Sequence, residues 1–139
     1  MSTILLFNIE DPIKKEAIRL TALRFGIKLL EILLGQQGMT LEELLGSGQT
    51  LPPLAQNSTT FTDEMLIMHA LNSEQFHGLL DTLRSTGQTV RLKAIVTEHN
   101  KSWSAVRLHR ELCAEEAAMR KQAALQKQHR SSEHRKHRR

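Results

Sequence analysis

The stretch Thr89–Trp103, TVRLKAIVTEHNKSW, decides how we expect this chain to fold. Val90–Thr97 is rich in aliphatic and β-branched residues and predicts a strand, while Ser102 predicts the start of a helix. The polar loop Glu98–Lys101 joins the two. We therefore expect the preceding residues to build a sheet that this strand joins, and the following residues to form a helix that covers the sheet.

The sequence of the first half predicts two strands and two helices in alternating order. Asp11 and Pro12 favour a helix start, because an aspartate caps free amides and proline suits the first helical position. In that helix Ile13, Ala17, Leu20 and Leu23 recur at helical spacing and predict its buried face. The predicted order is a strand at Thr3–Ile9, a helix at Pro12–Phe25, a strand at Ile27–Leu34 and a short helix from Thr40 to Gly46.

The second half repeats this order. Glu64–Leu71 predicts a strand, Asn72 caps a helix that stops at Gly87, and Val90–Thr97 is the second strand. Gly26 and Gly87 are 61 residues apart and occupy matching places. We interpret the chain as two βαβα units, residues 3–46 and 64–112, which arise by internal duplication and are joined by the linker 47–63.

This order predicts an α/β fold with one four-stranded sheet and covering helices. The strands within each unit should be parallel, because a helical crossover joins parallel neighbours. The direction of the central pair is not determined by the sequence. Both glycines should lie just past a helix end with positive φ, where a side chain costs about 1 kcal/mol.

The charges divide between a body and a tail. Residues 117–139 carry eight basic side chains and one acidic one, whereas residues 1–116 carry 11 basic and 14 acidic ones. The last helix should continue past Leu112, and from about His129 we expect disorder. We therefore expect a single α/β domain over 1–116 and a basic tail over 117–139. The tail is the candidate polyanion contact, through Arg130, Arg135, Lys136, Arg138 and Arg139.

The composition favours a cytoplasmic protein. Cys113 is the single cysteine, so no intramolecular disulfide can form. The apolar run Ile4–Phe7 is too short for a secretory signal, and no run approaches the length that spans a bilayer. We therefore expect no membrane association.

The loop after the last strand is the candidate ligand site. Its residues have two interpretations: they hold a small anion at the end of the strand, or they satisfy the loop amides and pack the helix onto the sheet. The candidate residues are Lys93, Thr97, Asn100, Ser102 and Trp103.

The residues of enzymes and metal sites give weaker patterns. His109 and Cys113 are four apart, as two metal ligands on one helix face would be, but two ligands do not make a site. His69, His77 and His99 are scattered, and GQQG and GSG lack the lysine of a phosphate loop. We therefore expect no cofactor, no metal and no catalytic residues.

The second half resembles a bacterial family. Leu92–Thr97, Asn100, Trp103, Leu108 and the pair Glu111-Leu112 are similar to the pattern of the domain of unknown function 3783. The resemblance covers Met65–Glu116 and implies no activity. The first half has no counterpart of Lys93, Asn100 or Trp103, so any site should lie in the second half only.

Three functions follow, in order of preference. The first is a small non-enzymatic interaction or regulatory protein whose basic tail contacts RNA or an acidic partner protein. The second is a ligand-sensing domain that holds a small anion at the Thr97–Trp103 loop. The third is an enzyme of unknown type.

Overall fold

The computed structural model describes residues 1–47 and 60–137, with the backbone alone at 47 and at 128–137. The chain divides into two compact units, Met1–His109 and Arg110–Arg139. The strands are β1 (Thr3–Phe7), β2 (Lys28–Ile32), β3 (Met65–His69) and β4 (Leu92–Ile95). The helices are α1 (Pro12–Arg24), the 3₁₀ turn η1 (Leu34–Gln36), α2 (Leu41–Ser47), α3 (Ser73–Ser85) and α4 (Ala105–His137).

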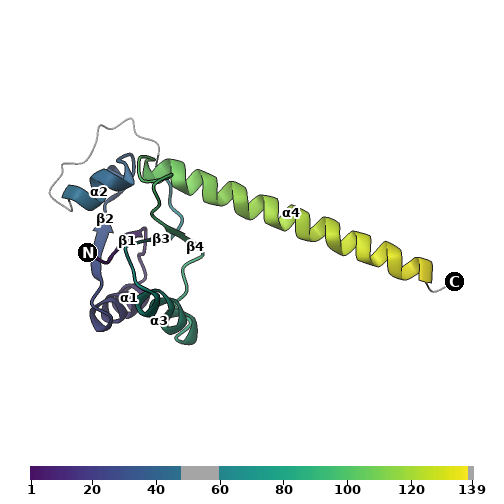
Figure 1. Cartoon of the computed structure of the whole chain (residues 1–139), viewed down its shortest axis with the longest axis horizontal. Coiled ribbons are helices and arrows are strands. Elements are labelled where there is room, and N and C mark those ends of the chain that lie inside the picture. The colour runs from purple at the N-terminus through teal and green to yellow at the C-terminus, as the bar shows by residue number, and fades with distance from the viewer. Residues whose placement is uncertain (48–59, 138–139) are drawn as a thin grey trace. The chain divides into compact units, whose positions relative to one another are not determined.

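The first unit is built on one four-stranded mixed sheet in the order β2-β1-β3-β4 (Figure 1). β1 pairs with β2 in parallel, and β3 pairs with β4 in parallel, as the helical crossovers require. The sequence left the direction of the central pair open. β1 and β3 are antiparallel, with Leu5 opposite Ile67 at the centre of the pairing. The predicted α/β fold with a single four-stranded sheet is confirmed.

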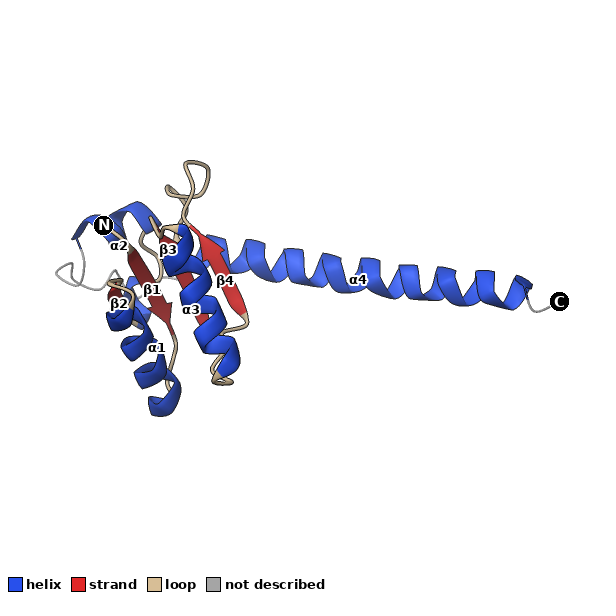
Figure 2. Cartoon of the chain, turned by 60° about the horizontal axis from the view of Figure 1, so that its bottom comes forward, coloured by secondary structure: helices blue, strands red, loops and turns tan. Residues whose placement is uncertain are grey.

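Alternation along the strands divides the core between the two faces of the sheet. Ile4, Leu6, Leu66 and Met68 pack into one hydrophobic cluster with residues of α1 and α3, which lie side by side on that face (Figure 2). The intervening residues of β1 and β3 are equally buried and point to the opposite face. On that face the buried side chains come from residues 39–44, Phe61 and the first turn of α4.

α1 buries a different stripe from the predicted one. Ile13, Leu20 and Leu23 are 70%, 51% and 70% exposed, so the predicted inward face points to solvent. Ile18, Thr21 and Ala22 are the buried residues of the helix. The short Thr21 and Ala22 side chains let the helix lie close to the sheet, and the larger side chains turn outward.

Glycines end the first and third helices as predicted. Gly26 has a φ of 68° and Gly87 a φ of 72°, each just past the end of its helix. Their amides donate to Leu23 O and Arg84 O. This left-handed region is one that side-chain-bearing residues adopt at a cost, so glycine is the residue that fits both helix ends.

The predicted boundaries on both sides of the loop after β4 differ from those in the structure. β4 ends at Ile95 rather than at Thr97, because the backbone turns there into a closed loop. α4 begins at Ala105 rather than at Ser102, and the hydroxyl of Ser104 accepts a hydrogen bond from Arg107 N at 3.1 Å. Most of the predicted linker 47–63 lies outside the described residues. The structure describes only residues 47 and 60–63 of it.

α4 continues to His137, so the disorder expected from about His129 is wrong. The helix contains no glycine or proline and is rich in alanine, leucine, glutamate, glutamine, lysine and arginine, which favour helix. An ion pair of Arg120 with Glu116, one turn earlier, adds support along its surface. Among the described residues, no helix has the length and apolar character needed to cross a bilayer.

Candidate functional site

The loop between β4 and α4 lies at the carboxyl end of β4 and closes on Asn100. The Asn100 side chain is 9% exposed, accepts from Thr97 N at 2.8 Å and donates to Ile95 O at 3.0 Å. Its own amide donates to the Thr97 hydroxyl at 3.2 Å. Asn100 therefore satisfies the backbone where β4 ends, which is the structural interpretation of this residue.

The loop is also attached to the start of α2. Leu41 N donates to Trp103 O at 3.0 Å, and Glu42 N donates to Lys101 O at 2.9 Å. An isolated antiparallel bridge joins Thr40 to Ser104, the residues that precede α2 and α4. These bonds fix the loop against the rest of the first unit through its backbone.

The other candidate residues do not gather into one site. The Lys93 ammonium donates to Val90 O at 2.6 Å, away from the loop. Ser102 is exposed, and helix capping falls to Ser104 instead. The Trp103 ring is partly exposed, with the Arg107 guanidinium 4.2 Å over it and the His99 ring edge-on at 5.2 Å. Sequence reasoning proposed Trp103 but did not predict these two neighbours. The start of α4 brings Arg107 to the ring, and the loop brings His99 to it.

Two cavities flank the carboxyl ends of β3 and β4. One, of about 600 Å³, is lined by Glu42, Leu45, Gly46, His69, Val96, Thr97, Glu98 and Lys101. The second, of about 420 Å³, has a mixed wall of apolar and polar residues: Met68, Ala70, Leu71, Asn72, Ser73, Phe76, His77, Ile95 and Val96. Thr97 is the one proposed ligand residue that lines either cavity.

Two of the charged side chains that line the larger cavity, those of Glu98 and Lys101, pair with each other. Lys101 Nζ lies 2.8 Å from Glu98 Oε2. This hydrogen bond lowers the pKa of Glu98 and raises the pKa of Lys101 from their ordinary values. Both groups therefore stay ionised at neutral pH, and the loop offers a neutralised pair rather than a net positive charge for an anion.

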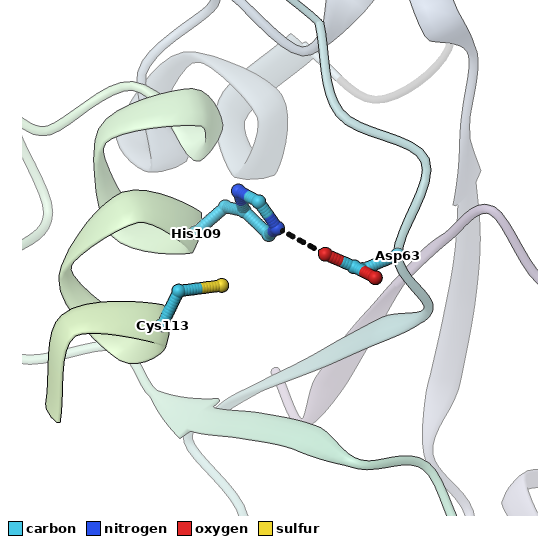
Figure 3. Close-up of side chains that lie close together, drawn as sticks. All are labelled: Asp63, His109 and Cys113. Carbon is cyan, nitrogen blue, oxygen red and sulfur yellow. Dashed lines mark hydrogen bonds and ion pairs between the residues drawn. The ribbon is translucent and has the colours of Figure 1, made fainter. Parts of the chain in front are cut away.

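A second polar group joins the segment before β3 to the start of α4 (Figure 3). His109 Nε2 lies 2.8 Å from Asp63 Oδ2, and Arg91 Nη2 lies 3.3 Å from Asp63 Oδ1. The His109 ring stacks on Phe61, with ring centroids 4.2 Å apart. Sequence reasoning noted His109 but not Asp63, because the two are 46 residues apart and only the fold brings them together.

Within the first unit, Asp63 and His109 are two neighbouring side chains of the kinds that bind metal ions. They offer an oxygen and a nitrogen, which are donor types that zinc accepts. Cys113 follows His109 by one turn of α4, as the sequence spacing predicted. Asp63 and His109 already bond to each other, so the bond between them has a structural role in holding Phe61 and the start of α4 together.

The Asp63 carboxylate should make stability depend on pH. Its bond to His109, followed by the charges of Arg91 and His109, lowers the pKa of Asp63. The folded pKa is therefore below the unfolded one, so the stabilisation is present above about pH 4 and is lost as the pH falls through the folded pKa. The group is half-exposed, so we expect Asp63→Asn to cost less than about 1 kcal/mol at pH 7 and nothing at low pH.

Urea unfolding of both proteins between pH 3 and pH 7 measures this difference. Asp81→Asn is the matched control, since Asp81 is exposed and makes only a 3.4 Å contact with Arg84. A difference between wild type and Asp63→Asn that stays constant down to pH 3 would contradict the prediction.

A buried polar network that sequence reasoning missed binds the backbone of Phe61. Gln37 is 0% exposed, and its side chain accepts from Phe61 N at 2.9 Å and donates to Asn8 Oδ1 at 3.2 Å. Asn8 Nδ2 donates to Phe61 O at 2.9 Å and to Asp63 O at 3.0 Å. Asn8 itself has a φ of 60°, a conformation that asparagine tolerates better than most residues. The network attaches residues 61–63 to the sheet.

The basic tail is helical over the residues described. Arg120, Lys121 and Lys127 are exposed on α4. Arg130, Arg135 and Lys136 belong to the same helix, where the backbone alone is described, and Arg138 and Arg139 lie outside the described residues.

Comparison with known protein families gives a match for one part of the chain. Residues 64–119 match the family model described as Domain of unknown function (DUF3783). The match covers β3, α3, β4 and the first turns of α4, which agrees with the resemblance seen in the sequence. No curated protein and no solved structure gives a significant match to the chain.

Proposed function

We propose that this protein is a non-enzymatic interaction module that binds RNA through the basic part of α4. The observation that carries the proposal is the charge along this helix. Residues 117–139 hold eight arginines and lysines against one glutamate, in a chain whose remaining residues are net acidic. Phosphates attract such a segment through counterion release, without reading the base sequence.

The helical state of the tail strengthens this proposal. A helix of residues 117–137 extends over about 30 Å, at about 1.5 Å per residue. A disordered arm would lose backbone conformational entropy on binding, whereas a formed helix has already lost it on folding. The exposed side chains of Arg120, Lys121 and Lys127 then need only small adjustments to reach successive phosphates.

The salt dependence of RNA binding tests this function. We expect the full chain to bind fluorescently labelled single-stranded RNA with a Kd of roughly 10⁻⁴–10⁻⁶ M near physiological salt. Changing Arg120, Lys121 and Lys127 to glutamine should make the plot of log K against log salt less steep. The magnitude of its slope should fall by about 2, at roughly 0.7 per lost contact. Fluorescence anisotropy at several salt concentrations measures both quantities.

A matched control removes the same charge from the first unit. Arg19, Lys28 and Arg84 are exposed cations of that unit, and their change to glutamine should leave the slope unaltered. If this control lowers the slope as much as the α4 variant does, the contact lies on the folded body and the proposal fails.

A second candidate function is the sensing of a small ligand at the loop after β4. The cavity of about 600 Å³ beside Thr97 favours it, because open α/β sheets bind ligands at the carboxyl ends of strands. The paired charges of Glu98 and Lys101 favour a zwitterionic or neutral polar ligand over a simple anion. A Thr97→Val variant that melts as wild type but no longer gains stability from a ligand found by thermal-shift screening would support this alternative.

We further propose that the two halves arose by duplication, in a bacterial cytoplasmic protein. α1 and α3 have 13 residues each, and Gly26 and Gly87 follow them with similar φ angles. Asn8 and Ala70, which follow β1 and β3, also share a positive φ, of 60° and 57°. The duplicated body then carries the asymmetric features, the Trp103 loop and α4, at the end of its second half.

A further inference from the structure

The single tryptophan of the chain lies outside the core. Trp103 is partly exposed in the turn before α4, whereas the core is aliphatic with two buried phenylalanines. The backbone of Trp103 makes the contacts that fix this turn: its amide donates to Asn100 O and its carbonyl accepts from Leu41 N. Any residue except proline could make those bonds, so the indole is not needed for the geometry of the turn.

The indole has the neighbours of a base-stacking surface. The Arg107 guanidinium lies 4.2 Å over the ring, and the His99 ring meets it edge-on at 5.2 Å. Both neighbours are exposed. Flat aromatic rings and guanidinium planes are the groups on which unpaired nucleobases stack, and the positive charge of arginine suits the adjacent phosphate.

The charge of this surface agrees with such a partner. Arg107 belongs to α4, the helix whose later turns carry the basic side chains of the proposed RNA contact. Lys101, on the same loop, pairs with Glu98, so Arg107 supplies the cation beside the ring. Duplex nucleic acid would present phosphates to Arg107 but would keep its base faces from the indole.

We propose that His99, Trp103 and Arg107 form a stacking surface that makes this protein prefer single-stranded RNA over duplexes and over polyanions without bases. The inference rests on the proposed function and adds its substrate class. α4 supplies the salt-dependent attraction to phosphate, and the Trp103 surface supplies the contact with a base.

The single tryptophan makes a direct test simple, because all indole emission of the full chain comes from Trp103. Titration with a uridine oligonucleotide should quench this emission along the same binding curve that anisotropy reports. Inorganic polyphosphate should compete with the oligonucleotide without quenching, because it has no base to stack. A duplex of the same length should bind without comparable quenching.

Substitutions separate stacking from charge. Trp103→Leu should weaken binding of the uridine oligonucleotide by about tenfold and leave polyphosphate binding unchanged. Trp103→Phe keeps a ring and should recover most of the affinity. Thermal melts of each variant establish that the fold is kept, so that a loss of binding is not a loss of structure.

The outcomes distinguish the two proposals. If RNA and polyphosphate bind equally, without quenching and without an effect of Trp103→Leu, the stacking surface is refuted while the role of α4 stands. If neither polyanion binds at low salt, both proposals fail. If the variant with neutralised α4 charges still shows quenching and binds RNA with full affinity, the stacking surface stands and the assignment of affinity to α4 fails.

Discussion

A chain that ends at Glu116 is expected to lose its affinity for RNA while keeping its fold. The deletion removes eight basic residues and one acidic residue, and the remaining chain carries 11 basic and 14 acidic ones. With its phosphate contacts gone, the affinity should fall by at least about a hundredfold at low salt. Anisotropy titrations of both proteins at 50 mM and 200 mM salt measure the loss.

The fold should survive because the deleted residues bury little apolar area. Met119 and Leu125, the largest apolar side chains there, are 70% and 57% exposed. The melting temperature should therefore stay within about 2 °C of that of the full chain. Full-length protein with the eight basic tail residues changed to glutamine is the control, since it keeps the helix length and removes only the charge.

Two results would count against the assignment to the tail. Equal RNA binding by the truncated chain would place the contact within residues 1–116. Full affinity of the glutamine variant would show that the length of the helix, rather than its charge, matters for binding.

Changing Gln37 to alanine should destabilise the first unit by about 2–4 kcal/mol. The substitution leaves the amide of Phe61 buried without its acceptor and removes the donor to Asn8. An unsatisfied buried amide costs about 1–3 kcal/mol, and the cavity left by the missing side chain adds to this. Urea unfolding monitored by far-ultraviolet circular dichroism measures the change.

Two further variants check the cause. Gln122→Ala removes an exposed amide from α4 and should change stability by less than about 0.5 kcal/mol. Asn8→Ala should be partly non-additive with Gln37→Ala, because both residues belong to one network. Strict additivity of the two changes would show that the network does not act as a unit.

The candidate site could be predicted only in part from the sequence. For Asn100 the structural interpretation agrees with the fold, because its side chain bonds to Thr97 N and Ile95 O. Ligand binding by the loop residues stays a prediction. The neighbours of Trp103 could not be predicted from the sequence. Arg107 and His99 reach its ring because of a turn whose shape depends on backbone bonds to residues 41 and 42. Asp63 meets His109 across 46 residues, a separation over which no spacing rule applies.

Local patterns alone determined the element order and the ends of α1 and α3. The capping residue Asp11, the capping box of Thr40 and Glu43, and the glycines after α1 and α3 act within a few residues of chain, so the sequence specifies them directly. The parallel pairing within each half followed from the helical crossovers. The excess of basic residues after Ala117 also needed no structure to be recognised.

Only the tertiary structure decided which surfaces meet. α1 contains two stripes at helical spacing, and packing against the sheet selected Ile18 and Ala22 over Ile13 and Leu20. The antiparallel junction of β1 and β3 joins residues about 60 positions apart, and Gln37 is buried because a distant segment, at Phe61, needs its oxygen. Such choices depend on the free energy of burying one surface against another, which no local stretch of sequence contains.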